Sequence, residues 1–106
     1  MLNMYSVYDS AAMIYTTPFY FHLDTEAVRV VESGLTDKNT YLARSPQDFA
    51  LYKVGKFDEQ TGQVISFENP EKIITAVEIL KSMIKRDEQQ MDIEEQTQIH
   101  SDNYTA

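Results

Sequence analysis

Cationic and aromatic side chains alternate along this chain in a way that could bind a polyanion. Exposed aromatic rings can stack on unpaired nucleic-acid bases while neighbouring cations hold the phosphates. On the residue pattern alone, a solvated surface of mixed charge is the simpler explanation, and both interpretations stay open here. The candidate phosphate and base contacts are, in chain order, Arg29, Lys38, Tyr41, Arg44, Tyr52, Lys53 and Lys56.

Catalytic and metal-binding patterns are missing from the sequence. His22 and His100 stand in unrelated contexts, and neither belongs to a spaced set of metal ligands. Asp58 and Glu59 are adjacent acids followed by a glycine-containing stretch, which is typical of a turn rather than of a general acid–base pair. We therefore expect a protein that is not an enzyme and that uses no cofactor and no metal.

Composition and charge divide the chain into a body and a tail. Its 106 residues suffice for one domain with one modest core. Residues 1–86 carry 11 acidic and 9 basic side chains, whereas residues 87–106 carry six acidic and no basic ones. We expect a single α+β domain over 1–86 and an acidic tail over 87–106 that is flexible or a frayed helix.

Hydropathy and cysteine usage indicate where such a protein would act. The chain has no cysteine, which fits a reducing compartment. No apolar run approaches the roughly 18 residues that a membrane span needs, and residues 1–10 lack the features of a signal peptide. We expect no contact with a membrane.

The strongest structural pattern predicts a β-hairpin with strands at 49–57 and 63–67. Both runs are rich in aromatic and β-branched residues. Asp58 suits the start of the turn, and Gly62 can adopt the left-handed conformation that closes it. Strand alternation assigns Phe49, Leu51 and Phe57 to one face and Tyr52 and Val54 to the other.

Two helices and a further strand are expected around this hairpin. A strand is predicted over Met4–Tyr8, and no conformation is assigned to residues 11–22. A short helix is predicted over 24–34, with Asp24 as its N-terminal cap and Gly34 as its C-terminal cap. The predicted fold class is α+β, a small antiparallel sheet with a central hairpin and helices on one side.

A longer C-terminal helix is predicted over 70–88. Asn69 and Pro70 resemble a capping residue followed by proline at the first helical position. An apolar seam follows at helical spacing, and it either packs on the sheet or forms a contact with a dimer partner. The residues of this seam are Ile73, Val77, Leu80 and Ile84.

Five short motifs occur in a fixed order along the chain. They are Tyr5–Ser10 (YSVYDS), Pro18–Tyr20 (PFY), Ala27–Arg29 (AVR), Pro46–Phe49 (PQDF) and Leu51–Gly62 (LYKVGKFDEQTG). With these motifs in this order, the chain resembles the small nonstructural protein of gokushovirus-type microviruses, bacteriophages with circular single-stranded DNA genomes. The resemblance covers roughly Met4 to Ile79, and Arg29 matches a recurring family position.

The resemblance implies a DNA-binding phage accessory protein in the host bacterial cytoplasm. That family is regarded as the counterpart of the microvirus protein that switches double-stranded replication to single-strand synthesis and genome packaging. A homodimer formed through the sheet edge or the apolar seam is expected. The alternative is an adaptor that docks on the phage replication initiator, the procapsid or a host replication protein, with the acidic tail as a DNA mimic.

Overall fold

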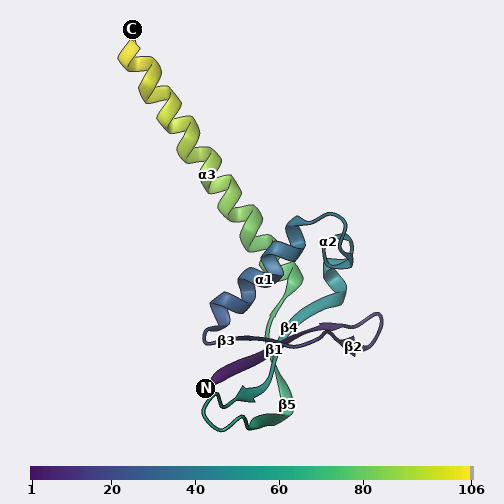
Figure 1. Ribbon diagram of the computed structural model, residues 1–106. Helices are drawn as coiled ribbons and strands as arrows, with labels where there is room; N and C mark the ends of the chain where they lie inside the picture. Colours follow the sequence, from purple (N-terminus) through teal and green to yellow (C-terminus); the bar gives the residue numbers. More distant parts are fainter. Residues whose placement is uncertain (106) are drawn as a thin grey trace.

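The computed structural model describes the backbone of residues 1–105 and the side chains of residues 1–91. A small antiparallel sheet lies on one side of the body and helices lie on the other, and the C-terminal helix projects away from both (Figure 1). In chain order the elements are β1 (Leu2–Asp9), β2 (Ile14–Tyr15), β3 (Phe19–Phe21), α1 (Asp24–Thr36), α2 (Tyr41–Arg44), the 3₁₀ turn η1 (Pro46–Asp48), β4 (Phe49–Phe57), β5 (Val64–Thr75) and α3 (Ala76–Thr105).

The sheet is antiparallel, with strands in the order β2-β1-β4-β5 and β3 paired with the other end of β1. β4 and β5 form the predicted hairpin, and β4 lies inside the sheet between β1 and β5. The α+β fold class and the central hairpin are thus confirmed. Residues 11–22, which received no prediction, form the two short strands that pair with β1.

The hairpin loop has the expected chemistry. Gly62 has a φ of +75°, and its amide donates to the Asp58 carbonyl at 2.8 Å. The Asp58 carboxylate accepts from the amides of Gln60 and Thr61, at 2.9 and 3.3 Å, and these hydrogen bonds hold its pKa below the usual value. Asp58 therefore serves the turn.

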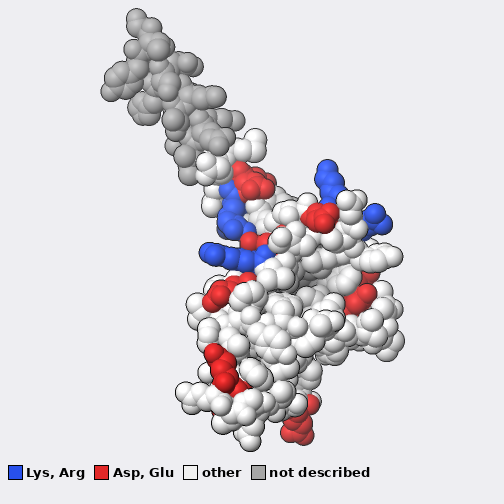
Figure 2. Space-filling view, viewed as in Figure 1, with Lys and Arg blue, Asp and Glu red and all other residues white. Residues whose placement is uncertain are grey.

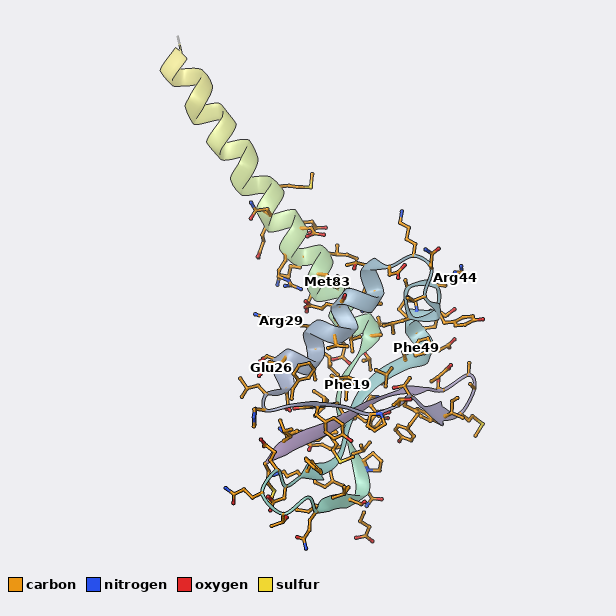
Figure 3. The ribbon with its side chains drawn as sticks, viewed as in Figure 1. Phe19, Glu26, Arg29, Arg44, Phe49 and Met83 are labelled. Atoms are coloured by element: carbon orange, nitrogen blue, oxygen red, sulfur yellow. The ribbon has the colours of Figure 1, made fainter. Side chains whose placement is uncertain are left out.

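The core lies between one face of the sheet and two helices. Tyr5 of β1 and Leu51 of β4 are fully buried there, and Phe19 and Phe49 pack against the same cluster from the ends of β3 and β4 (Figure 3). The helices contribute apolar side chains at helical spacing, which is why both lie on this one face. These helical core residues are Ala27, Val31 and Leu35 of α1 and Ala76 and Ile79 of α3.

A β-bulge reverses the expected alternation along β4. Met4 pairs with Gly55 and Tyr5 pairs with Lys53, so Val54 has no partner on β1. An unpaired residue moves every later side chain of its strand to the opposite face. Phe57 consequently shares a face with Tyr52, and the prediction that placed it with Phe49 was wrong.

The C-terminal helix begins six residues later than predicted. Pro70 lies within β5, which a proline can enter because β5 is the edge strand of the sheet. Thr75 caps α3 instead: its hydroxyl oxygen accepts from the Glu78 amide at 3.1 Å and its hydroxyl donates to the Glu78 carboxylate at 2.9 Å. The helix runs to Thr105 rather than ending at 88.

Helix α1 begins without the predicted aspartate cap. Leu23 occupies the N-cap position, and no side chain caps the helix there. The Asp24 carboxylate instead interacts with two residues of the sheet: it accepts a hydrogen bond from the Tyr5 hydroxyl and forms an ion pair with the Lys53 ammonium. Gly34 is also not the helix end, because α1 continues to Thr36, and its missing side chain instead makes room for Leu42 of α2.

Candidate nucleic-acid interface

One face of the sheet is left uncovered by α1 and α3, and we call it the tyrosine face. Its members follow from strand pairing, because residues that pair across an antiparallel sheet lie on the same face. They alternate with the core residues Tyr5 and Leu51 along β1 and β4. The paired positions of the tyrosine face are Leu2, Met4, Ser6 and Tyr8 of β1, Tyr15 of β2, Tyr20 of β3, Ala50, Tyr52, Gly55 and Phe57 of β4, and Val64, Ser66, Lys72 and Thr75 of β5.

Three tyrosines form a connected cluster on this face. The rings of Tyr8 and Tyr15 are 4.6 Å apart, and Tyr52 meets both edge-on, at 6.1 Å from Tyr8 and 5.7 Å from Tyr15. Tyr15 is 43% exposed and is the outermost ring. Rings that contact one another hold fixed orientations, so the cluster is a preorganised surface for stacking.

A second aromatic pair lies at the other end of the same face. The rings of Tyr20 and Phe57 meet at 6.1 Å, and with Leu2 they line an apolar hollow of about 310 Å³. The two aromatic groups are joined along β1 by Met4, which pairs with Tyr20. Aromatic side chains therefore occur along the length of the face.

A smaller pocket opens beside the tyrosine cluster, and we call it the Ala50 pocket. Ala50 pairs with Tyr8 on one side and Thr75 on the other, so a methyl group lies between larger neighbours. The pocket has a volume of about 190 Å³. Its lining residues are Tyr8, Ser10, Gln47, Asp48, Phe49, Ala50, Tyr52, Lys72 and Thr75.

Charge on the tyrosine face is sparse and positive. Lys72 is the charged residue among the paired positions, and it lies opposite Tyr52 in the register. No acidic side chain occupies any of these paired positions. A polyanion would meet one cation and no local carboxylate among them, although Asp48 lines the neighbouring pocket.

Three of the predicted DNA contacts gather at α2, away from the sheet. Tyr41 is 78% exposed, and Lys38 and Arg44 are exposed on either side of it. The Arg44 Nε donates to the Lys38 carbonyl at 3.4 Å, and Arg44 lies at this corner of the molecule in Figure 3. This group could hold phosphate, but it contains one ring and has no sheet surface beneath it.

Lys53 and Lys56 lie on the helix side of β4, opposite Tyr52. The Lys53 ammonium is 3.0 Å from the Asp24 carboxylate and 5.9 Å from the centre of the Tyr5 ring, and its side chain is only 15% exposed. Lys56 pairs with Asn3 near the hairpin end. The structure therefore does not bring these two lysines together with Tyr52.

Arg29 lies on the outer side of α1, near α3 (Figure 3). In the view of Figure 2 the basic side chains gather there and at the α2 corner, and none is visible over the sheet. The predicted cations thus occupy at least three separate places, at α1, at α2 and on β4. As phosphate contacts they stay a prediction.

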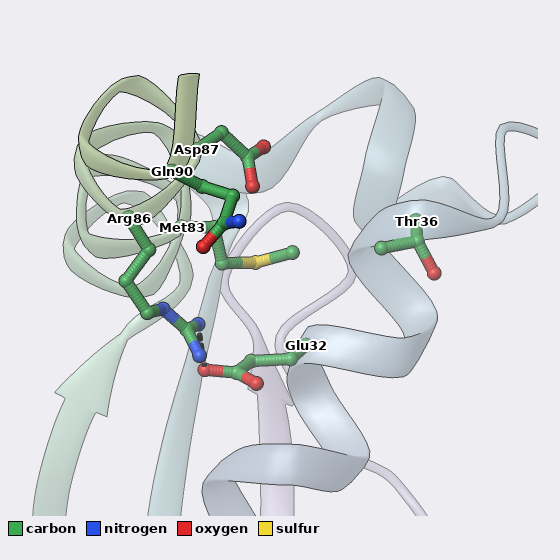
Figure 4. Close-up of a pocket in the computed structure, with 6 residues that line it drawn as sticks. All are labelled: Glu32, Thr36, Met83, Arg86, Asp87 and Gln90. Atoms are coloured by element: carbon green, nitrogen blue, oxygen red, sulfur yellow. Dashed lines mark hydrogen bonds and ion pairs between the residues drawn. The ribbon is translucent and has the colours of Figure 1, made fainter. Parts of the chain in front are cut away.

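A groove of about 420 Å³ lies where α3 leaves α1 (Figure 4). The Arg86 guanidinium crosses it and meets the Glu32 carboxylate at 2.6 Å. Because the two charges neutralise each other, this ion pair joins α1 to α3, and the groove does not offer a free cation to an anion. Its lining residues are Glu32, Thr36, Met83, Arg86, Asp87 and Gln90.

The predicted apolar seam is divided between two elements. Ile73 lies in β5 and packs against the core, and Leu80 packs there from α3, whereas Ile84 is 50% exposed. Placing Ile73 on the helix was wrong, because α3 begins only at Ala76. A dimer contact through Val77 and Ile84 stays a prediction.

Sequence reasoning missed most of the tyrosine face. The predicted DNA contacts include Tyr52 but not its neighbours Tyr8, Tyr15 and Lys72. Tyr8 could have been found from its alternation with Tyr5 and Val7 in the first strand, while Phe57 could not, because no local signal announces the bulge at Val54. The predicted helix over 70–88 includes Lys72, and a lysine on that helix would not pair with Tyr52 across a sheet.

The described part of the chain has neither a metal-binding cluster nor a membrane-spanning helix. Its His, Asp and Glu side chains form no group that could hold a metal ion. No helix within it is long and apolar enough to cross a membrane.

Comparison with known proteins gives one result. The family model described as "Phage ORF5 protein" matches residues 2–79, which span every strand, α1, α2 and the start of α3. No curated protein and no solved structure matches the chain.

Proposed function

The chain belongs to the Phage ORF5 protein family, and on that premise we propose that it is a bacteriophage accessory protein that binds single-stranded DNA on its tyrosine face. The observation that carries the proposal is the contact of Tyr8, Tyr15 and Tyr52 on a sheet surface free of helices. Stacking on aromatic rings requires unpaired bases, which a single strand offers and a duplex does not.

The body can carry this activity despite the acidity of the chain. Residues 1–86 are close to neutral, and the paired positions of the tyrosine face include Lys72 and no acid. Stacking supplies affinity that does not depend on net charge. The tail repels DNA at long range and so lowers the affinity of the full chain without occupying the site.

The role we propose is non-enzymatic and belongs to the switch from double-stranded replication to single-strand genome synthesis and packaging, in the host bacterial cytoplasm. A protein that holds single strands keeps them from being copied back into duplex. Homodimers would place two such faces on one strand and raise the affinity through linked binding.

Fluorescence anisotropy with single- and double-stranded oligonucleotides tests the proposal. The full chain should prefer the single strand, and Tyr52→Leu should weaken binding by about tenfold, in the range of one lost stacking contact. Tyr41→Leu is the matched control, because Tyr41 is exposed at α2 and away from the sheet. Equal loss of single-strand affinity in Tyr52→Leu and Tyr41→Leu, or absence of DNA binding at low salt, would refute the tyrosine face as the binding site.

An adaptor is the second candidate, and helix α3 favours it. The helix reaches Thr105, and on its described part Ile84 and Met91 are 50% and 60% exposed. Six acidic and no basic residues follow Arg86, so a basic partner, such as a replication or capsid protein that itself binds DNA, would fit. Co-purification from infected cells with and without residues 87–106 tests it: a specific partner that requires the tail supports the adaptor.

A further inference from the structure

We propose that the Ala50 pocket receives a single unstacked base of the bound strand and selects cytosine or adenine, which carry an exocyclic amino group, over thymine, which carries none. This inference rests on the proposed function and gives it a sequence preference. It concerns the pocket that two rings of the cluster, Tyr8 and Tyr52, line together with Ala50.

The size of the pocket limits its occupant. Sites for whole small ligands usually enclose roughly 300–1,000 Å³, whereas this pocket encloses about 190 Å³. It has room for a flat ring and none for the attached sugar and phosphate. The occupant is therefore one base of a polymer whose backbone stays outside.

The walls of the pocket match a flat ring. Tyr8 and Tyr52 both line it, with their ring centres 6.1 Å apart and their planes at 87°, so an inserted base can stack on the face of one of them. The small side chain of Ala50, paired with Tyr8, keeps the floor open. Lys72 stands beside Tyr52 at the rim, where the phosphate of an inserted nucleotide would lie.

The polar rim provides the selection. The Asp48 carbonyl is already occupied, since it accepts from both the amide and the hydroxyl of Ser10, at 2.8 and 3.0 Å. The Asp48 carboxylate has no hydrogen bond or ion pair with any residue that the structure describes. A carboxylate only accepts, so it pairs with an exocyclic amino group and is repelled by the carbonyl oxygen that thymine has at the same position.

Anisotropy titrations of the full chain with single strands of about ten nucleotides test the pocket. Oligo-dC should bind about fivefold more tightly than oligo-dT, and Asp48→Asn should narrow that difference. Ala50→Leu fills the pocket and should weaken oligo-dC binding by about tenfold while leaving oligo-dT nearly unchanged. Ala12→Leu, at an exposed alanine in the turn before β2, is the control and should change neither.

A second measurement does not depend on any variant folding. Amide NMR spectra of the unmodified chain should show the largest shifts at Ala50, Asp48 and Thr75 on addition of oligo-dC. Equal affinity for the two oligonucleotides, or shifts confined to Tyr15 and Tyr20, would overturn the base pocket while the tyrosine face survived. Absence of all DNA binding would remove the proposed function as well.

Discussion

The Lys53 ammonium lies 3.0 Å from the Asp24 carboxylate, and this pair joins the middle of β4 to the first turn of α1. The Tyr5 hydroxyl donates to the same carboxylate oxygen at 2.5 Å from the centre of β1. Three elements that are distant in sequence therefore meet at one carboxylate. A lysine held in this way positions a helix on a sheet, which explains why Lys53 is nearly buried while most other cations are exposed.

Replacing Lys53 by methionine should test its structural role. The methionine keeps the apolar stem but removes the charge that faces Asp24, so the free energy of unfolding should fall by about 0.5–1 kcal/mol. DNA affinity and its salt dependence should stay as in the unmodified chain. Urea denaturation and anisotropy are the two measurements, and Lys56→Met is the control for the loss of one positive charge. A loss of DNA affinity specific to Lys53→Met would restore it as a phosphate contact.

The Asp24 carboxyl should make stability depend on acid pH. Its pKa is lowered in the folded protein, first by the Tyr5 hydroxyl and also by Lys53, although burial opposes them. A folded-state pKa below the unfolded value gives stability that is present above about pH 4 and is lost as the pH falls through the folded value. Urea denaturation at a series of acid pH values should show this loss, and Asp24→Asn should remove it.

The Tyr5 hydroxyl should make stability fall at alkaline pH. Burial, followed by its hydrogen bond to Asp24, raises the pKa of Tyr5 from 10 to about 12. Because the folded value is the higher one, its contribution is complete below pH 10 and disappears as the pH rises toward about 12. Tyr5→Phe should lower the free energy of unfolding by about 1 kcal/mol at pH 7 and should reduce the loss of stability at alkaline pH. If Tyr5→Phe loses stability at alkaline pH as steeply as the unmodified chain, other titrating groups cause that loss.

Gly55 marks a close approach between the two long strands. A Cβ atom at this position would lie 2.3 Å from the Ile65 carbonyl oxygen, which is backbone and cannot rotate away. Gly55→Ala should therefore destabilise the protein by about 1–3 kcal/mol through forced separation of β4 and β5. Thermal and urea unfolding measure the effect. Gly62→Asn in the same hairpin is the control, since its turn has open space and asparagine tolerates a positive φ.

The sequence was sufficient for the elements whose signals are local. The hairpin followed from two β-rich runs around Asp58 and Gly62, and the body of α1 followed from its apolar spacing. The role assigned to a residue was wrong where a distant partner decided that role, as at Asp24, although α1 does begin at residue 24 as predicted. The Asp24 side chain could cap a helix, but in the folded chain its carboxylate instead accepts from the Tyr5 hydroxyl and forms an ion pair with Lys53. These contacts exist only in the folded chain.

Pro70 shows how a sound local rule can mislead. Asparagine followed by proline often begins a helix, but at a sheet edge the missing amide of proline costs no pairing. The actual start of the helix is indicated five residues after Pro70 by Thr75-x-x-Glu78, a capping box. The tyrosine face was harder to foresee, because it depends on the bulge at Val54 and on the pairing of Lys72 with Tyr52.

The capping box of α3 should be measurable. Thr75→Ala removes both the acceptor for the Glu78 amide and the donor to its carboxylate, so the free energy of unfolding should fall by about 0.5–2 kcal/mol. Thr75→Ser keeps the hydroxyl and should retain most of the free energy of unfolding that Thr75→Ala loses. Because Thr75 also lines the Ala50 pocket, oligo-dC affinity is measured together with stability. If Thr75→Ser retains stability but not oligo-dC affinity, or the reverse, the capping role of Thr75 is separate from its role in the pocket.

Lys72 should account for one phosphate contact on the tyrosine face. A single-stranded contact contributes about 0.7 to the slope of log affinity against log salt, since each neutralised phosphate releases condensed counterions. Lys72→Gln should reduce the slope by that amount, and Lys72→Arg should preserve it. Lys38→Gln at the α2 corner is the matched control and should leave the slope unchanged if DNA lies on the sheet. If Lys38→Gln changes the slope and Lys72→Gln does not, the strand instead follows the α2 corner, where Tyr41 would be the stacking ring.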